Sequence, residues 1–111
     1  MLTSVADYLS QFRLESPLVH VRNRVKELSR LSFEEARQLP EISESKFRIA
    51  RKNYSWIEWR DQLQTGDQQI VVQVWRRGWL GTSRQLARDG FVVSPSGASR
   101  PLTSEEWDAF D

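Results

Sequence analysis

Tryptophan and arginine residues are concentrated in one part of the chain, and their chemistry is that of a binding surface. Four of the five tryptophans lie between Tyr54 and Val93, among several arginines. The arginine guanidinium binds phosphate or carboxylate through two parallel hydrogen bonds, and tryptophan stacks on bases or anchors protein interfaces. This stretch therefore predicts either a binding surface or an ordinary sheet with arginines on its solvated face.

The spacing of these residues favours one candidate surface. Residues 69–77 alternate like a strand, so Trp75 and Arg77, which are two residues apart, share one face. Trp79 follows in a predicted turn, and Arg84 lies on the next predicted strand. We expect these four residues to form an exposed contact surface. The alternative, in which the tryptophans fill the core and the arginines pair with carboxylates, fits the sequence equally well.

Catalytic and metal-binding residue types are sparse. His20 is the only histidine, cysteine is absent, and the carboxylate pairs Glu41/Glu44 and Glu58/Asp61 lie among basic residues that can neutralise them. The glycines follow neither a Walker pattern nor a dinucleotide-binding pattern. We therefore predict no catalytic site, no cofactor and no metal site. His20 is expected to be a partly packed or solvent-facing ring.

The charges are unevenly distributed, although the net charge is only +1. Residues 1–44 hold six basic and seven acidic side chains, residues 45–100 hold ten and four, and residues 101–111 hold none and four. The middle segment is therefore basic by six, and the last eleven residues are acidic by four. The acidic end either lies against the basic sheet and neutralises part of it, or leaves the sheet as a positive patch for a partner.

Helix signals occupy the first third of the chain. Ser4 can cap a short helix that ends near Phe12, and Ser16 with Pro17 starts a second helix whose narrow apolar stripe reaches Leu28. The opposite face of this helix, which includes Arg24, is expected to be solvated. The stripe either packs on the sheet or forms a dimer seam.

Two capping boxes predict two further short helices. Ser32 with Glu35 starts the first, and Thr103 with Glu106 starts the second at the end of the chain. The last helix is expected to fold its aromatic residues, Trp107 and Phe110, back on the core.

Strand signals fill most of the region from Phe47 to Val93. The patterns predict an extended segment from about Phe47 and strands over residues 54–63, 69–77, 82–88 and 91–93. Asp89 and Gly90 indicate a hairpin turn between the last two. The expected architecture is a single α+β domain over residues 1–111. Its N-terminal helices pack on an antiparallel meander of about four strands, and a short helix closes the chain.

No apolar run approaches the roughly 20 residues of a membrane helix, and the first residues do not resemble an export signal. We expect a small cytoplasmic, non-enzymatic module of the immunity, inhibitor or adaptor kind. It would bind another protein through the tryptophan and arginine face of its sheet or through its helical stripe. The alternative is a nucleic-acid-binding domain that uses the same basic aromatic face. No membrane partner is expected, and the oligomeric state is left open.

Overall fold

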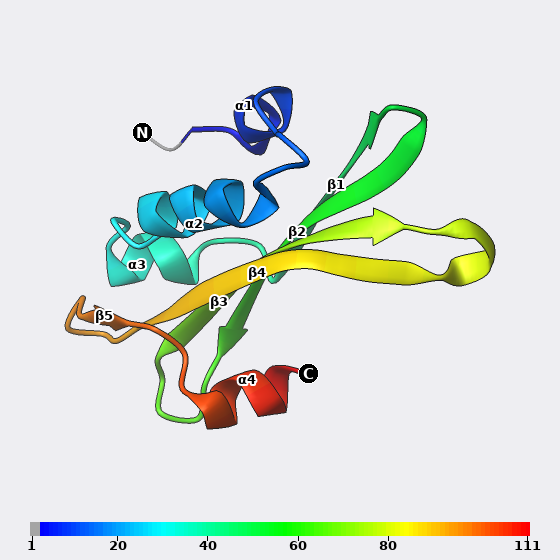
Figure 1. Ribbon diagram of the computed structural model, residues 1–111. Helices are drawn as coiled ribbons and strands as arrows, with labels where there is room; N and C mark the ends of the chain where they lie inside the picture. Colours follow the sequence, from blue (N-terminus) through cyan, green and yellow to red (C-terminus); the bar gives the residue numbers. More distant parts are fainter. Residues whose placement is uncertain (1–2) are drawn as a thin grey trace.

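An antiparallel sheet forms the centre of the computed structural model, which describes residues 3–111 (Figure 1). Its five strands pair in chain order, each with the next. They are β1 (Ile42–Ile49), β2 (Lys52–Gln62), β3 (Gln68–Arg77), β4 (Ser83–Val93) and β5 (Ser99–Arg100). The α+β meander predicted from the sequence is confirmed, with five strands where about four were expected.

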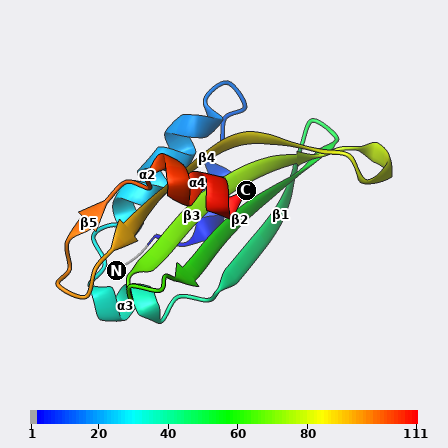
Figure 2. The same ribbon diagram turned by 90° about the horizontal axis from the view of Figure 1, so that it is seen from below.

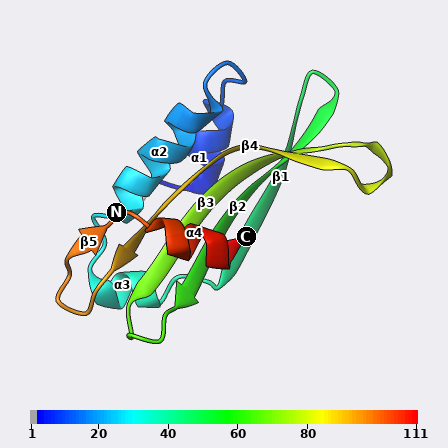
Figure 3. The same cartoon turned by 60° about the horizontal axis from the view of Figure 1, so that its bottom comes forward.

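Helices cover both faces of this sheet. α1 (Val5–Ser10), α2 (Pro17–Leu28) and α3 (Phe33–Arg37) lie on one face, and α4 (Ser104–Phe110) lies on the other (Figures 2 and 3). We call these the α1–α3 face and the α4 face. Within the described residues, no helix is both long enough and apolar enough to cross a membrane.

β3 is buried on both faces, as predicted for a central strand. Ile70 and its same-face neighbours pack with α2 and β2 in the larger core cluster. Val71 packs on the α4 face with Val92 of β4 and with Leu102. The two aromatic residues of α4, Trp107 and Phe110, lie against this smaller cluster, so their predicted docking on the core is confirmed.

The predicted capping boxes are both present. At Ser32 and at Thr103 the side-chain oxygen accepts a hydrogen bond from a backbone N–H three residues later. The glutamates at those later positions, Glu35 and Glu106, accept from the capping residue's own backbone N–H. Each box satisfies N–H groups that the first turn of a helix leaves unpaired.

β4 runs without interruption through Asp89 and Gly90, so the hairpin turn predicted there is wrong. Gly90 lies opposite Val71, and a Cβ atom added to it would lie 2.6 Å from the carbonyl oxygen of Ile70 and 3.0 Å from Leu102 Cδ1. Glycine is required here by the close approach of neighbouring atoms and not by a turn.

The first hairpin begins earlier than the sequence predicted. β1 starts at Ile42 instead of near Phe47, and it turns into β2 through Ala50 and Arg51. Both turn residues have positive φ, 51° and 66°, as in a two-residue turn of type I′. Residues 43–46 are four consecutive polar residues, which concealed the first half of β1 as a strand.

Candidate functional site

Trp75 and Arg77 share the α4 face, as their spacing predicted, and both side chains are half-buried. The indole Nε1 of Trp75 donates to Oε1 of Gln73 at 3.2 Å. Arg77 donates through Nε to Ser55 Oγ at 2.8 Å, and its Nη2 lies 2.6 Å from Oε2 of Glu44. These contacts hold both side chains against the sheet.

Arg84 does not share this face. In the β3–β4 ladder Arg84 lies opposite Arg76, whereas Trp75 lies opposite Gln85. Directly opposite residues of an antiparallel pair point to the same side of the sheet. Arg84 therefore lies on the side of Arg76, away from Trp75 and Arg77, and the four predicted residues do not form one surface.

Trp79 lies in the tip of the β3–β4 hairpin, which extends beyond the helices (Figure 1). We define the hairpin tip as residues 78–82. Trp79 and Leu80 are each 84% exposed. The N–H of Gly78 donates to the carbonyl oxygen of Thr82 at 2.6 Å, and Thr82 Oγ1 donates to that of Trp79 at 2.8 Å. These bonds close the tip while both apolar side chains remain in water.

Leu80 is a candidate residue that the sequence analysis missed. The available signal was a pair of large apolar residues enclosed by Gly78 and Gly81 within a turn. Arg84 lines a shallow hollow beside the tip together with Arg76 and Trp79. Arg84 is thus associated with Trp79 and not with Trp75.

Positive charge is concentrated at the same end of the sheet. The β1–β2 turn lies at the same end of the sheet as the hairpin tip, since Asn53, close to that turn, is paired with Arg77 (Figure 1). Residues 46–54 hold four basic side chains, residues 75–85 hold three, and neither range holds an acidic one. We call these side chains the basic end: Lys46, Arg48, Arg51, Lys52, Arg76, Arg77 and Arg84. Glu44 borders the basic end, and hydrogen bonds from Arg77 and then Ser55 lower its pKa.

A hollow of about 920 Å³ lies between α4 and the sheet. Trp59, Trp75 and Phe110 are among its walls. Oε1 of Gln73 accepts from Trp59 Nε1 at 2.8 Å and from Trp75 Nε1 at 3.2 Å, and its Nε2 donates to Gln85 at 2.9 Å. These polar groups are paired with one another by hydrogen bonds, so the network stabilises this face of the sheet.

The acidic end of the chain lies against the sheet and neutralises part of its positive charge. This was the first of the two arrangements expected from the sequence. Arg88 of β4 pairs with Asp111, and its guanidinium carbon lies 4.4 Å from the ring centre of Trp107. Arg100 forms two hydrogen bonds with Glu106, at 2.7 and 2.9 Å. The bonds from Arg100, followed by the N–H of Thr103, lower the pKa of Glu106 to about 2. In residues 3–111 no ion pair joins α4 to the basic end.

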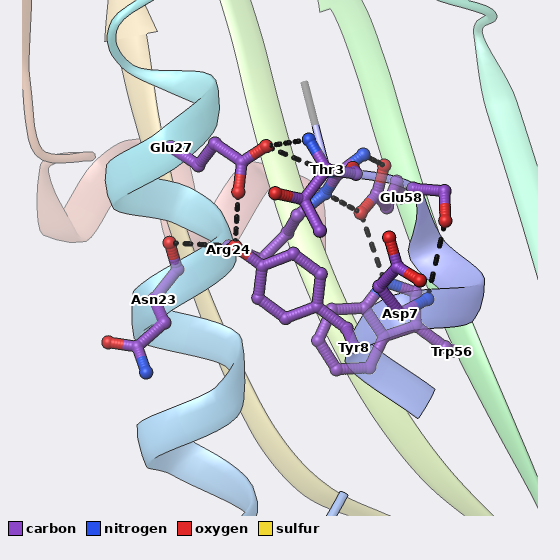
Figure 4. A network of polar contacts seen from close by, with 9 residues as sticks. Thr3, Asp7, Tyr8, Asn23, Arg24, Glu27, Trp56 and Glu58 are labelled. Atoms are coloured by element: carbon purple, nitrogen blue, oxygen red, sulfur yellow. Dashed lines mark hydrogen bonds and ion pairs between the residues drawn. The ribbon is translucent and has the colours of Figure 1, made fainter. Parts of the chain in front are cut away.

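A buried polar network joins α1, α2 and β2 (Figure 4). Arg24 is only 5% exposed, so the predicted solvated position is wrong for this residue. Its Nε and Nη2 lie 2.7 and 3.2 Å from the two carboxylate oxygens of Glu58, which also accepts from Trp56 Nε1 at 3.0 Å. Tyr8 donates to Glu27, and burial followed by this bond raises the pKa of Tyr8 to about 12. The partnered charges attach the helices to the sheet.

His20 has a structural role. Its Nε2 accepts a hydrogen bond from the backbone N–H of Arg13 at 3.0 Å, and its ring centre lies 5.2 Å from that of Phe12. Burial and then the charge of Arg13 lower the pKa of His20, which favours the neutral ring. The expectation of a partly packed ring is confirmed.

Among residues 3–111, no three carboxylate or histidine side chains converge as a metal site.

The hairpin tip and the basic end together are the candidate functional site. Of the large apolar side chains in residues 3–111, the two most exposed lie there, next to the densest run of basic residues. Comparisons with protein families, curated proteins and solved structures give no match to this chain.

Proposed function

We propose that the protein is a small non-enzymatic interaction module that binds another protein through its hairpin tip. Trp79 and Leu80 are the anchors, and the neighbouring arginines of the basic end flank them. The observation that carries this proposal is the 84% exposure of both anchors. The other exposed large apolar side chains of the described part of the chain reach at most 52%: Leu14, Leu18, Val19 and Ile42.

Binding would remove a large apolar area from water. A tryptophan buries roughly 150–250 Å² in an interface, which corresponds to about 4–6 kcal/mol before the costs of association are subtracted. The hydrogen bond between Gly78 and Thr82 already fixes the tip, so binding costs little further backbone entropy. Interface cores also favour Trp and Arg over Lys, and the chain has 13 arginines and 3 lysines.

The proposal places the protein among inhibitors, immunity proteins or adaptors, which act by occupying a partner. Trp75 and Arg77 would support the base of the hairpin from the α4 face, and Arg84 would contact the partner beside Trp79. A cytoplasmic location is part of the proposal, because a chain without cysteine needs no oxidising compartment to form its fold.

A second candidate function is nucleic-acid binding by the same end of the sheet. The observation that favours it is the basic end, with seven basic side chains and no acidic one in residues 46–54 and 75–85. Phosphates would bind these side chains while Trp79 stacked on a base. Leu80 has no role in such stacking, whereas an apolar pocket of a partner protein accommodates both anchors. Protein binding is therefore the better explanation of the tip.

The experiment that tests protein binding is quantitative affinity capture from a lysate with three forms of the chain. The wild type should retain a specific partner, and the double variant Trp79→Ala/Leu80→Ser should lose it. Leu14→Ser is a matched control, because Leu14 is also exposed, at 40%, but lies between α1 and α2 and not in the hairpin tip. A partner held equally by all three forms would contradict the proposal.

A titration with oligonucleotides separates the two candidates. Single-stranded and duplex oligonucleotides are added at low and at moderate salt while the tryptophan emission of the wild type and of Trp79→Ala is followed. Protein binding predicts no saturable change. A saturable change that weakens steeply with salt, and that is lost in an Arg76→Ala/Arg84→Ala variant, would favour nucleic-acid binding instead.

A further inference from the structure

The outer edge of β1 carries backbone groups without a neighbouring strand. β1 is the first strand of the sheet order and pairs on one side with β2 (Figures 2 and 3). Within residues 3–111, no strand pairs with its other side. An edge of this kind is a template for pairing with another chain unless the protein protects it.

Two observations identify which residues face outward. The two-residue turn after β1 closes on the pair Ile49 and Lys52, and such a turn is closed by a hydrogen-bonded pair. At the other end of the strand, the N–H of Arg60 donates to the carbonyl oxygen of Glu41 at 2.9 Å. Odd-numbered residues therefore face β2, since hydrogen-bonded pairs alternate along an antiparallel ladder. The residues whose N–H and C=O point outward are Ile42, Glu44, Lys46 and Arg48.

We propose that β1 pairs with β1 of a second copy of the chain, antiparallel, so that the two sheets become one. In the register we assign, Ser45 lies opposite Ser45 of the second copy. Glu44 then lies opposite Lys46 of the second copy, and Lys46 lies opposite its Glu44. Ile42 lies opposite Arg48, so every outward-facing residue gains a partner for both backbone groups.

The charges select this register over its neighbours. A slip of two residues in one direction places Glu44 opposite Glu44. A slip in the other direction also pairs Glu44 with Arg48, but it places Lys46 opposite Lys46, whereas the assigned register contains no like-charge pair. Like charges directly opposite each other destabilise a strand pair, whereas opposite charges stabilise it. A slip of one residue would pair outward-facing with inward-facing backbone groups, so it is excluded by the ladder geometry.

A second copy of the chain is the partner because the charges along the β1 edge are self-complementary. Charged residues on an edge strand ordinarily prevent pairing. Here Glu44 and Lys46 are two residues apart on one face, and the two-fold arrangement brings each against its opposite. The antiparallel arrangement also directs the two hairpin tips to opposite ends of the joined sheet. Each copy keeps Trp79 and Leu80 free, so this inference does not rest on the proposed function.

Sedimentation over a range of protein concentrations tests the pairing. The wild type should be a dimer in reversible equilibrium with monomer. Lys46→Glu and Glu44→Lys should each weaken the dimer by about tenfold or more, because each creates two like-charge pairs. The double variant Glu44→Lys/Lys46→Glu restores both opposite pairs and should dimerise more tightly than either single variant, but less tightly than the wild type, because it also removes the ion pair between Glu44 and Arg77 within each copy. Arg22→Glu, an equal charge change on the exposed side of α2, should have no effect.

Hydrogen exchange adds a measurement at the interface itself. The amide N–H groups of Glu44 and Lys46 should be protected in the wild-type dimer and exchange rapidly in Lys46→Glu. Circular dichroism confirms that each variant is folded. A wild type that stays monomeric at every concentration overturns the proposal. So does a Lys46→Glu variant that dimerises like the wild type, or a folded double variant that remains monomeric.

Discussion

Arg24 of α2 and Glu58 of β2 form an ion pair beneath the N-terminal helices, with Nε and Nη2 at 2.7 and 3.2 Å from the two carboxylate oxygens (Figure 4). Their side chains are only 6% and 13% exposed. The carbonyl oxygen of Thr3 accepts from Nη1 of Arg24 at 2.6 Å, and Trp56 donates to Glu58. One pair thus connects the start of the chain, α2 and the sheet.

Removal of one partner of this pair should destabilise the protein strongly. Arg24→Ala leaves the Glu58 carboxylate buried without its counter-charge, and we expect the free energy of unfolding to fall by about 3–5 kcal/mol. Urea unfolding followed by circular dichroism measures the change. Arg22→Ala is the control on the same helix, and its exposed position predicts a change within about 0.5 kcal/mol. Similar effects of both substitutions would show that the ion pair is not the cause.

The sheet could be predicted from the sequence because its central strands alternate clearly or are rich in aromatic residues. The start of β1 and the continuity of β4 through Gly90 could not be predicted. Ile42 to Lys46 contains two serines and two charged residues, a pattern that an edge strand shares with a loop. Asp89 followed by Gly90 resembles a hairpin turn, and only the distance to Ile70 shows why a glycine lies inside a strand.

The substitution Gly90→Asn distinguishes close packing from a turn at this position. Asparagine tolerates positive φ, so a turn residue would accept it at little cost. In β4 the added Cβ would lie 2.6 Å from the Ile70 carbonyl oxygen, and Gly90→Asn should lower the free energy of unfolding by about 1–3 kcal/mol.

Gly97→Asn is the matched control for this substitution. Gly97 has φ of 91°, and a Cβ atom there would meet nothing within 4 Å. Gly97→Asn should cost less than Gly90→Asn, because asparagine tolerates positive φ and no neighbouring atom obstructs the added side chain. Thermal unfolding of the two variants checks the contrast. A stable Gly90→Asn variant would mean that the strands separate easily at this position.

Glu106 makes the stability of the protein vary with pH in the acid range. Its pKa is about 2 when folded, chiefly because of the hydrogen bonds from Arg100, against an ordinary value of 4.5. A carboxyl group with a lowered pKa contributes stability above its unfolded pKa, and this contribution is lost as the pH falls from 4.5 toward 2. Because Arg100 is 45% exposed, solvent screening limits the contribution to about 1 kcal/mol.

The substitution Glu106→Gln isolates this charge, since glutamine also completes a capping box. It should lower the free energy of unfolding by about 1 kcal/mol at neutral pH and by almost nothing near pH 2. Urea midpoints measured across this range provide the test. Glu105→Gln, which changes an exposed neighbour, should show a much smaller difference. A loss that stayed constant with pH would rule out the ion pair as its source.

The candidate site was only partly predictable. The shared face of Trp75 and Arg77 follows from their spacing within one strand, which the sequence displays directly. The position of Arg84 depends on the pairing across the hairpin, including a register shift between Val74 and Trp75. Such a shift changes which residues of the two strands lie opposite each other and therefore share a face, and no spacing within a single strand reveals it.

Trp79 should be the tryptophan that reports on the surface without contributing to stability. Trp79→Ala removes a side chain that is 84% exposed, so the free energy of unfolding should change by less than about 0.5 kcal/mol. The same variant should lose most of the emission that iodide quenches, because Trp56 is fully buried and the other three tryptophans, Trp59, Trp75 and Trp107, are half-buried. Trp56→Ala is the contrasting variant and should cost about 3–5 kcal/mol. If Trp79→Ala lowered stability by a similar amount, the ring would belong to the core, and the hairpin tip would have no anchor to offer a partner.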